Sequence, residues 1–237
     1  MLADRTGAGT PWLELSFLGA ERYRNGVAVH PGDVIASSGR GYRAKADAFQ
    51  TDPRYALRVY GRAQAGSDGR VWLQYRWFYF LNDYRLVGDR LAVGTHEGDW
   101  EMIQLRLDAE RCSPDLALYT HHRTAQTRPW EAVEKVGEQP LVYVARGSHG
   151  CYFTAGTRWT GAWFDHADGR VDLGPCELEI VDDGPAHEWI RWPGAWGGTV
   201  ARRGLPGLLD GSSPAGPGAP WHIRWRDPAI LFDRVTG

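Results

Sequence analysis

Hydrophobic and polar residues alternate with a period of two over two stretches of the chain, 71–83 and 99–107. This is the pattern of a β-strand, in which successive side chains point to opposite faces of a sheet. In the first stretch the odd positions are expected on the core face, which therefore ends in Asp83. In the second stretch the aliphatic face begins with two carboxylates, Asp99 and Glu101.

Shorter segments of strand character lie on both sides of these stretches. The chain contains 30 Gly and 14 Pro, which favours many turns over long helices. Short strands with frequent turns are typical of an all-β sandwich. We therefore predict an antiparallel, jelly-roll-like β-sandwich with long loops and little helix, formed by one domain over residues 1–237. The shorter expected strands are 54–61, 115–121, 140–146, 146–153 and 176–182.

The remaining segments are expected to be irregular. Residues 1–50 are rich in turn-forming residues, and 129–136 are expected to form one or two helical turns. From Pro193 to Pro220 the chain is rich in Gly, Pro and Ser and is too long for an ordinary connection, which predicts a functional flap or a surface wrap. The apolar tail that follows is expected to dock back on the domain.

Composition limits the class of protein. The 237 residues are 43% hydrophobic and 24% charged, as in an ordinary soluble globular protein. The formal net charge of -2 gives no attraction to nucleic acid, and a membrane surface is not favoured as a partner. Cys112, Cys151 and Cys176 lack the spacing of a zinc or redox site, so we expect reduced cysteines and a cytoplasmic protein. No apolar run approaches the ~18–20 residues of a spanning helix.

Four residues form a candidate metal site. His96, Asp99 and Glu101 lie within six positions, and Asp83 would reach the same end of the core if the two long strands form a hairpin. Carboxylates in a core need a cation, an arginine or a proton. Oxygen ligands favour Mg²⁺ or Ca²⁺, while the histidine admits Mn²⁺ or Zn²⁺. The residues alone leave open a metal site or a rim of ion pairs. The candidate arginines of such a rim are Arg76, Arg85 and Arg90.

Two histidines at the ends of strand candidates, His121 and His149, are candidates for general acid or base. A half-buried structural role is the commoner one, but neighbouring strands could bring the two together. Ser148 is not expected to be a nucleophile served by His149, because adjacent strand residues face opposite sides. The sequence has no phosphate-binding glycine loop, dinucleotide fingerprint, nucleophile elbow or His-Glu-x-x-His motif.

Tryptophan is abundant, with 12 residues. One explanation is core packing, and the other is an aromatic wall over a pocket for a small molecule. The tryptophans near the Gly- and Pro-rich segment are Trp189, Trp192, Trp196, Trp221 and Trp225.

Between residues 70 and 228 the chain contains LQYRWFYFLNDY, GTHEGDWEMIQLRL, YTHH, VYVARGSHGCYFTAG, WPGAWGG and SPAGP. In this order the motifs resemble the Vps62-related (DUF946-like) family. A more distant resemblance is to the necrosis-inducing NPP1-like cytolysins, whose signature Gly-His-Arg-His-Asp-Trp-Glu aligns with residues 95–101.

The resemblance to the cytolysins implies a β-sandwich that holds a divalent cation. In that family the first histidine, the aspartate and the final glutamate of the signature surround the cation with an upstream aspartate. The matching residues are His96, Asp99 and Glu101, with Asp83 as the fourth ligand across a longer loop. Gly98 stands where the signature has its second histidine, so the resemblance implies the fold and the metal rather than cytolysis.

Three functions are compatible with these observations. The first is a divalent-metal-dependent enzyme, by default a hydrolase of a small molecule bound in an aromatic-lined pocket, with His121 or His149 as acid or base. The second is a lyase or cyclase of specialised, terpenoid-like metabolism, in which ring faces stabilise a carbocation. The third is a non-catalytic protein that binds a lipid or glycan headgroup through the metal.

Overall fold

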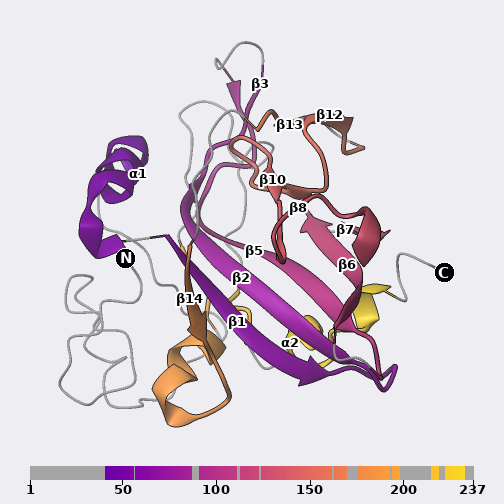
Figure 1. Ribbon diagram of the computed structural model, residues 1–237. Coiled ribbons are helices and arrows are strands. Elements are labelled where there is room, and N and C mark those ends of the chain that lie inside the picture. Colours follow the sequence, from indigo (N-terminus) through magenta and orange to yellow (C-terminus); the bar gives the residue numbers. More distant parts are fainter. Residues whose placement is uncertain are drawn as a thin grey trace. The chain divides into compact units, whose positions relative to one another are not determined.

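The computed structural model is mostly β and is built around one six-stranded sheet (Figure 1). It describes residues 41–55, 57–86, 91–110, 113–122, 124–161, 163–169, 176–192, 194–197, 215–218 and 222–232. The strand order is β14-β1-β2-β5-β6-β7. Pairing is antiparallel for β1–β2, β5–β6 and β6–β7, and parallel only for β1–β14. These strands are β1 (Arg58–Ala65), β2 (Val71–Asn82), β5 (His96–Leu107), β6 (Pro114–His121), β7 (Thr124–Pro129) and β14 (Glu177–Ile180).

Short two-stranded ribbons and a few helices complete the described chain. The ribbons are β3 (Arg85–Leu86) with β4 (Leu91–Ala92), β8 (Lys135–Val136) with β9 (Gln139–Pro140), β10 (Tyr143–Val144) with β11 (Cys151–Tyr152), and β12 (Gly156–Trp159) with β13 (Phe164–Ala167). The α-helices are α1 (Tyr42–Thr51) and α2 (Ile223–Arg226), and the 3-10 helices are η3 (Pro53–Tyr55), η4 (Trp130–Ala132) and η5 (Pro185–Arg191). No helix of the described residues is long and apolar enough to cross a membrane.

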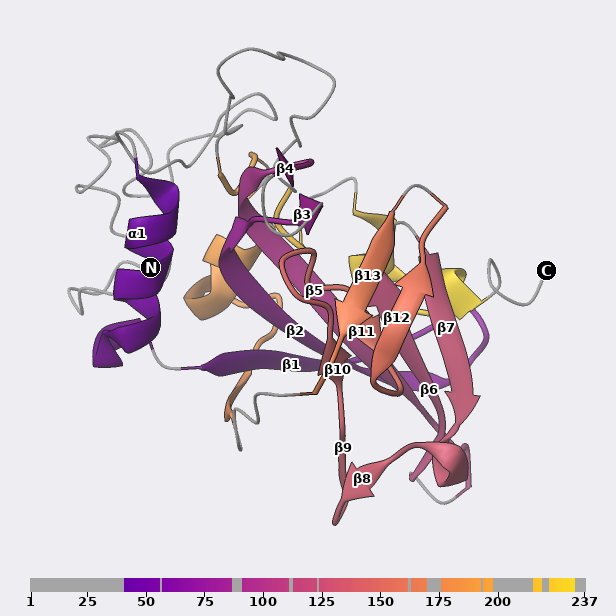
Figure 2. The ribbon, with the colours of Figure 1, turned by 90° about the horizontal axis from the view of Figure 1, so that it is seen from above.

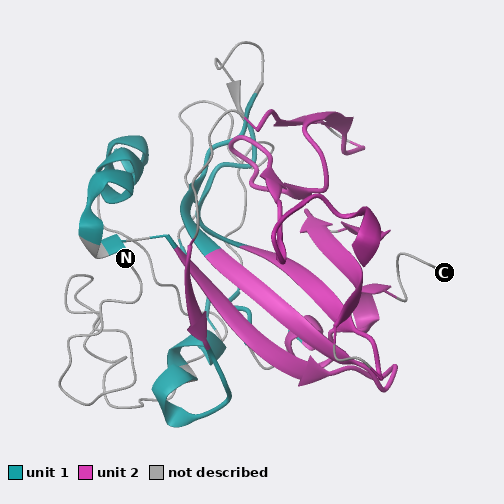
Figure 3. Cartoon of the chain, viewed as in Figure 1, with its two compact units in different colours: residues 1–57, 78–100, 181–222 teal, residues 58–77, 101–180, 223–237 magenta. Residues whose placement is uncertain are grey.

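The chain divides into two compact units (Figure 3). Unit 1 consists of residues 1–57, 78–100 and 181–222, and unit 2 of residues 58–77, 101–180 and 223–237. Strands β2 and β5 each contribute residues to both units. The prediction of one domain over 1–237 stays a prediction.

Unit 2 packs apolar residues on both faces of its sheet. On one face, Ile103, Leu105 and Tyr119 contact residues of the covering segments, Cys151 and Phe153. The other face carries a second cluster, and the yellow C-terminal segment that contains α2 lies over it (Figure 1). That second cluster consists of Trp72, Met102, Leu118, Ala125, Ala229 and Leu231. The central strands of the sheet are therefore covered on both faces.

This two-sided burial corrects the predicted core face of β2. The even residues Trp72, Gln74 and Arg76 are the deeply buried ones, with 0%, 0% and 4% of their surface exposed, whereas Val71 is 43% exposed. The odd residues are only partly buried, although Leu73 packs on the first cluster. Gln and Arg in the even set gave that face the sequence pattern of a solvated surface. The polar residue Gln74 on this face is hydrogen-bonded beneath the C-terminal segment and is not exposed to solvent.

Unit 1 is held by aromatic packing around Trp196. Its ring contacts Trp100 at 5.2 Å, Phe78 at 5.9 Å, Trp189 at 6.0 Å and Trp192 at 6.2 Å between centroids. Trp189, Trp192 and Trp196 are only 1–2% exposed. Each such pair contributes about 0.5–1.5 kcal/mol beyond the burial of its area. For these rings the structure therefore supports core packing over the wall of an open pocket.

The all-β, sandwich-like fold is confirmed, and most long strands lie where alternation predicts them. The prediction of turns over 1–50 is wrong for its described end, because α1 occupies residues 42–51 and packs Phe49 on Phe80 at 4.8 Å. The predicted helical turn at 129–136 appears as η4. Most of the predicted flap at 193–220, and also Cys112, Trp221 and Arg90, lie outside the described residues.

Replacing Gly98 with alanine is expected to destabilise the protein by roughly 3 kcal/mol or more, because a Cβ there overlaps the Trp196 carbonyl oxygen. The matched control is Gly69→Ala, which has a similar φ, +73° against +74°, but open space around the new Cβ. The control is expected to lose only about 1–2 kcal/mol, the cost of left-handed backbone. Urea denaturation of both variants measures the difference, and equal losses would contradict the close approach of the two segments.

Candidate functional site

The carboxylate of Asp83, a predicted metal ligand, forms ion pairs with two arginines. Its Oδ2 accepts hydrogen bonds from Arg43 Nε and Nη2 at 3.0 and 2.5 Å, and its Oδ1 accepts one from Arg85 Nε at 3.0 Å. This is the ion-paired alternative that the sequence left open, with Arg85 as a named partner and Arg43 as an unforeseen one. Two guanidinium groups already neutralise this carboxylate, so it does not fit a cation ligand as it stands.

His96 has the hydrogen bonding of a metal-ligating histidine. Its Nδ1 lies 2.8 Å from the carbonyl oxygen of Gly98, which can only accept, so Nδ1 carries the proton. Nε2 of the neutral ring is then the nitrogen with a free electron pair. Metal-bound histidines commonly donate their other N–H to a carbonyl in this way. Asp99, on the same strand and in the same unit, is 8% exposed.

Glu101 belongs to unit 2, where its Oε2 lies 3.9 Å from the Cys151 thiol, a weak donor. Among the described residues, no three His, Cys, Asp or Glu side chains lie close enough together to hold a metal ion. A cation bound by Asp83, His96, Asp99 and Glu101 therefore stays a prediction that the structure does not assemble.

A different cluster gathers around Asp165 in unit 2. This side chain, on β13, has no exposed surface. Its carboxylate accepts hydrogen bonds from Ser148 Oγ at 2.7 Å, Tyr152 Oη at 2.6 Å and His122 Nε2 at 2.9 Å. Ser148 lies in the 146–148 turn, Tyr152 lies on β11, which Figure 2 shows beside β13, and His122 directly follows β6. A buried carboxylate with three donors is fully satisfied.

His121 belongs to the same cluster. Its ring lies 4.9 Å from that of Tyr152, and the Gly150 backbone is close to both His121 and Asp165. A Cβ at Gly150 would lie 3.0 Å from Asp165 Oδ2 and 3.0 Å from the Cβ of His121, so only glycine leaves room there. The backbone directly after His149 therefore lies against His121, and the acid or base roles of the two histidines stay a prediction.

The backbone of two histidines in this region is unusual. His122 has φ 53° and His149 has φ 59°, both in the left-handed region, and they are the only non-glycine residues with positive φ in the described part of the chain. Such a conformation costs of order 1–3 kcal/mol for a residue with a Cβ. Both residues flank the Asp165 cluster. The chain thus keeps side chains at two positions where glycine would be less strained.

Burial and hydrogen bonding set the charges of the cluster. Burial alone would raise the pKa of Asp165, but hydrogen bonds from His122, Tyr152 and Ser148 outweigh it and hold that pKa below 3.8. Burial, followed by the hydrogen bond to Asp165, raises the pKa of Tyr152 far above 10. Burial, followed by the charge of His122, lowers the pKa of His121 below 6.5. At neutral pH Asp165 is therefore an ionised carboxylate, Tyr152 a neutral phenol and His121 a neutral imidazole.

Exposed aromatic rings lie beside the cluster. Trp159 and Phe164 face each other across the β12–β13 ribbon, 4.9 Å apart, and are 59% and 49% exposed. Trp163 meets the His122 ring edge-on at 5.6 Å. Phe164 and Asp165 are consecutive, so the strand that buries the carboxylate also presents a ring to solvent. This is a surface on which an apolar or sugar-like ligand can stack.

The sequence prediction missed Asp165, His122 and Tyr152. His122 and Asp165 are separated by 43 positions, and no spacing rule joins them. The available signals were the His-His dipeptide at the end of a strand and a single aspartate within an aromatic strand. Only the fold shows that the two residues meet.

No family model and no curated protein match this sequence. Five chains of solved structures do. One, described as NLPPya in complex with glucosamine, is 16% identical with a TM-score of 0.41, over 59% of this chain and 58% of that one. Another is Necrosis and Ethylene inducing Protein 2 from the causal agent of cocoa's witches' broom disease, at 17% and 0.39, over 69% and 64%. A third, described as a toxin fold for microbial attack and plant defense, has 14% and 0.41, over 69% and 72%.

This chain therefore covers less than two thirds of the length of the first two structures. The neighbours include necrosis-inducing proteins, in line with the NPP1-like resemblance of the sequence. At these TM-scores the likeness is distant and gives no argument about the site. Membership of the Vps62-related family stays a prediction.

The lowered pKa of His121 predicts a loss of stability on acidification. The group stays neutral in the folded protein but takes up a proton on unfolding once the pH falls below 6.5. Its contribution is complete above pH 6.5 and is lost as the pH falls through the lowered pKa of the folded state. We expect His121→Gln to flatten the pH dependence of the unfolding free energy just below pH 6.5 relative to wild type. Urea denaturation at a series of pH values measures this, and identical slopes would contradict it.

Proposed function

We propose that the chain is a hydrolase of a small molecule, with His122 as general base and Asp165 as its positioning residue. The observation that supports this is the 2.9 Å hydrogen bond between His122 Nε2 and the fully buried Asp165 carboxylate. An ionised carboxylate can only accept, so Nε2 carries the proton and Nδ1 keeps its electron pair. The His122 side chain is 25% exposed, so water and a substrate can reach it.

The proposed reaction needs only this dyad and water. Nδ1 of His122 takes a proton from water while the water oxygen bonds to the electrophilic atom of the substrate. The imidazolium that forms is stabilised by the adjacent Asp165 carboxylate, which stays ionised. His122 then returns the proton to the departing oxygen as the bond to the leaving group breaks. General acid–base catalysis of this kind contributes about 10²–10⁴-fold to the rate.

The neighbouring groups support this assignment. The hydrogen bonds from Ser148 and Tyr152 fix the orientation of the Asp165 carboxylate, so the His122 ring has one preferred position. The exposed pair Trp159 and Phe164 offers a stacking surface for an apolar or sugar-like part of the substrate. His121 and His149 remain candidates for a second acid or base beside the dyad.

The test is hydrolysis of a panel of carboxylic esters, phosphoesters and glycosides. His122→Asn is expected to lower kcat/KM by about 100-fold or more on the substrate that wild type accepts. His166→Asn is the matched control, since it lies on β13 next to Asp165 but is exposed and hydrogen-bonded to Thr157. Asp165→Asn should also move the acidic limb of the pH–rate profile, which a purely structural role would not do. Full activity of His122→Asn, or no wild-type turnover on the whole panel, would contradict the proposal.

We also propose a divalent-cation site at His96 and Asp99 in unit 1. The supporting observation is the His96 Nδ1 hydrogen bond to Gly98, which leaves Nε2 as a potential ligand; Asp99, three residues further along β5, supplies a mostly buried carboxylate. The bound cation would supply a Lewis acid or a contact to a lipid or glycan headgroup. Mg²⁺ or Ca²⁺ suits the carboxylate, and Mn²⁺ or Zn²⁺ suits the imidazole. A lyase or cyclase role stays a prediction.

Metal analysis of protein purified without added metal tests this second site. Wild type is expected to hold up to one equivalent of a divalent cation, and Asp99→Ala is expected to lose most of it. The control is Asp182→Ala, which removes an exposed carboxylate paired with His187 in the same unit. Equal metal contents in wild type and Asp99→Ala would end the metal hypothesis, whatever the outcome for His122.

A further inference from the structure

The face of the sheet that α2 covers contains a buried arginine with no counter-ion among the described residues. Arg76 lies on β2, directly opposite Tyr60 of β1, and is 4% exposed. Its Nε and Nη2 are buried and have no hydrogen-bond partner. An unsatisfied polar group in the interior costs about 1–3 kcal/mol, and more when it is charged. A side chain in this state needs a partner, and the described part of the chain supplies none for these two nitrogen atoms.

Two further positive charges lie near Arg76. Arg62, on β1, places its guanidinium carbon 4.0 Å from the ring centre of Trp225, and that of Arg76 is 5.5 Å from the same ring. Trp225, which is 3% exposed, holds the two guanidinium groups against one aromatic surface. Arg224 precedes it on α2 and adds a third positive charge. Burial, with the charges of Arg62 and Arg224, lowers the pKa of Arg76 to about 9.

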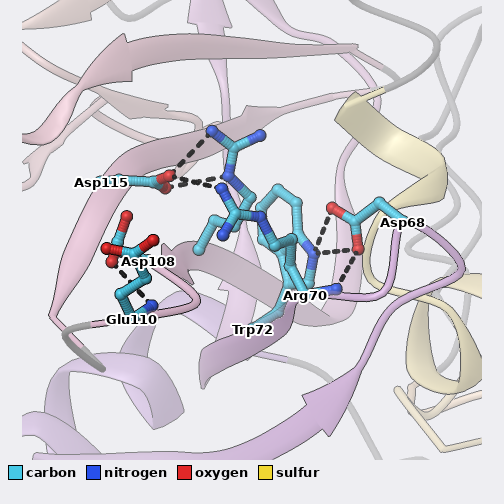
Figure 4. Close-up of polar contacts among 7 residues, drawn as sticks. Asp68, Arg70, Trp72, Asp108, Glu110 and Asp115 are labelled. Carbon is cyan, nitrogen blue, oxygen red and sulfur yellow. Dashed lines mark hydrogen bonds and ion pairs between the residues drawn. The ribbon is translucent and has the colours of Figure 1, made fainter.

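Other arginines of the same sheet do have acidic partners. Arg70 lies 3.5 Å from Asp115, and Arg106 donates to Asp115 at 2.9 and 3.1 Å (Figure 4). Arg58, on β1, is paired with Glu177 and Glu179 of β14. Among the described residues no carboxylate is paired with Arg76. Arg58, Arg70 and Arg106 are thus partly exposed and paired with carboxylates, whereas the buried Arg76 lies near other positive charges.

We propose that Arg76, with Arg62 and Arg224, forms a binding site for a phosphate group. The unpaired Nε and Nη2 of Arg76 are two donors of one planar fork, which matches two oxygens of an oxyanion. Three guanidinium groups favour a doubly charged phosphate over a singly charged carboxylate. Gln74, directly opposite Arg62 in the sheet, has a buried Oε1 without a donor. That oxygen can accept a hydrogen bond from the P–OH of a monohydrogen phosphate, which sulfate lacks.

This site is separate from the proposed hydrolytic dyad. Side-chain alternation places His121 with Tyr119 on one face of β6, whereas Arg76 shares the opposite face of the sheet with Trp72. The ligand is inorganic phosphate or the phosphoryl group of an organic phosphate. Both sources present the same charge and oxygens to Arg76, and only experiment separates them.

Calorimetric titration and thermal unfolding at constant ionic strength test the proposal. The probes are inorganic phosphate and glycerol 3-phosphate, with sulfate and chloride as comparators. Wild type is expected to bind one phosphate or phosphoryl probe saturably and to gain thermal stability. Arg76→Met should weaken that binding by at least about 10-fold. Arg70→Met, which alters an arginine directly before β2 that is ion-paired with Asp115, should bind like wild type. Preference for one of the two phosphate probes identifies the source.

The stability of Arg76→Met without ligand supplies an independent readout. Replacing an unpaired buried charge with an apolar side chain of similar length is expected to leave the ligand-free protein at least as stable as wild type. A large drop in its Tm would show that Arg76 is a structural ion-pair partner and would overturn the proposal. Equal responses to phosphate, sulfate and chloride, or no response to either phosphate probe, would overturn it as well.

Discussion

The cover on both faces of the central sheet is the constraint on which the rest of unit 2 depends. A sheet with one solvated face can carry any polar side chain there at little cost. Here the segments around Cys151 and Phe153 close one face, and those around Ala229 and Leu231 close the other. The polar groups of the central strands that lie under these covers, among them Gln74, Arg76 and Gln104, are therefore removed from water, and each must find a partner inside the protein or bind one from outside.

The polar groups of this sheet and its covering segments meet that constraint in different ways. Gln74 and Gln104 bond to each other at 2.6 Å and reach the carbonyl oxygens of Arg224 and Pro228, which ties the C-terminal segment to the sheet. Asp165 accepts hydrogen bonds from three donors in three segments. Nε and Nη2 of Arg76 have no acceptor among the described residues. A carboxylate whose hydrogen bonds are all formed is held rigidly, as a catalytic dyad requires. A buried donor without an acceptor, as in Arg76, instead favours the binding of a ligand.

The sequence is informative where structure is local. The alternation of 71–83 and 99–107 located β2 and β5, because a period of two is a property of one strand. It did not locate the deeply buried face of β2, because a second covering layer is a tertiary fact and Gln74 looks solvated by its type alone. Asp83 with Arg43, 40 positions apart, and His122 with Asp165 are likewise partners that only folding brings together. Strand positions and the nearby partner Arg85 of Asp83 could thus be predicted, but charge partners distant in the sequence could not.

The left-handed backbone of His122 has a consequence for how the protein would evolve. A turn that served only to connect β6 to β7 would be more stable with glycine at that position, since glycine adopts positive φ without strain. Selection for stability alone would drive the histidine out, so its presence places a lower limit on what its side chain contributes to fitness. At position 122 the stability of the fold would favour glycine, whereas the proposed role of the side chain requires histidine.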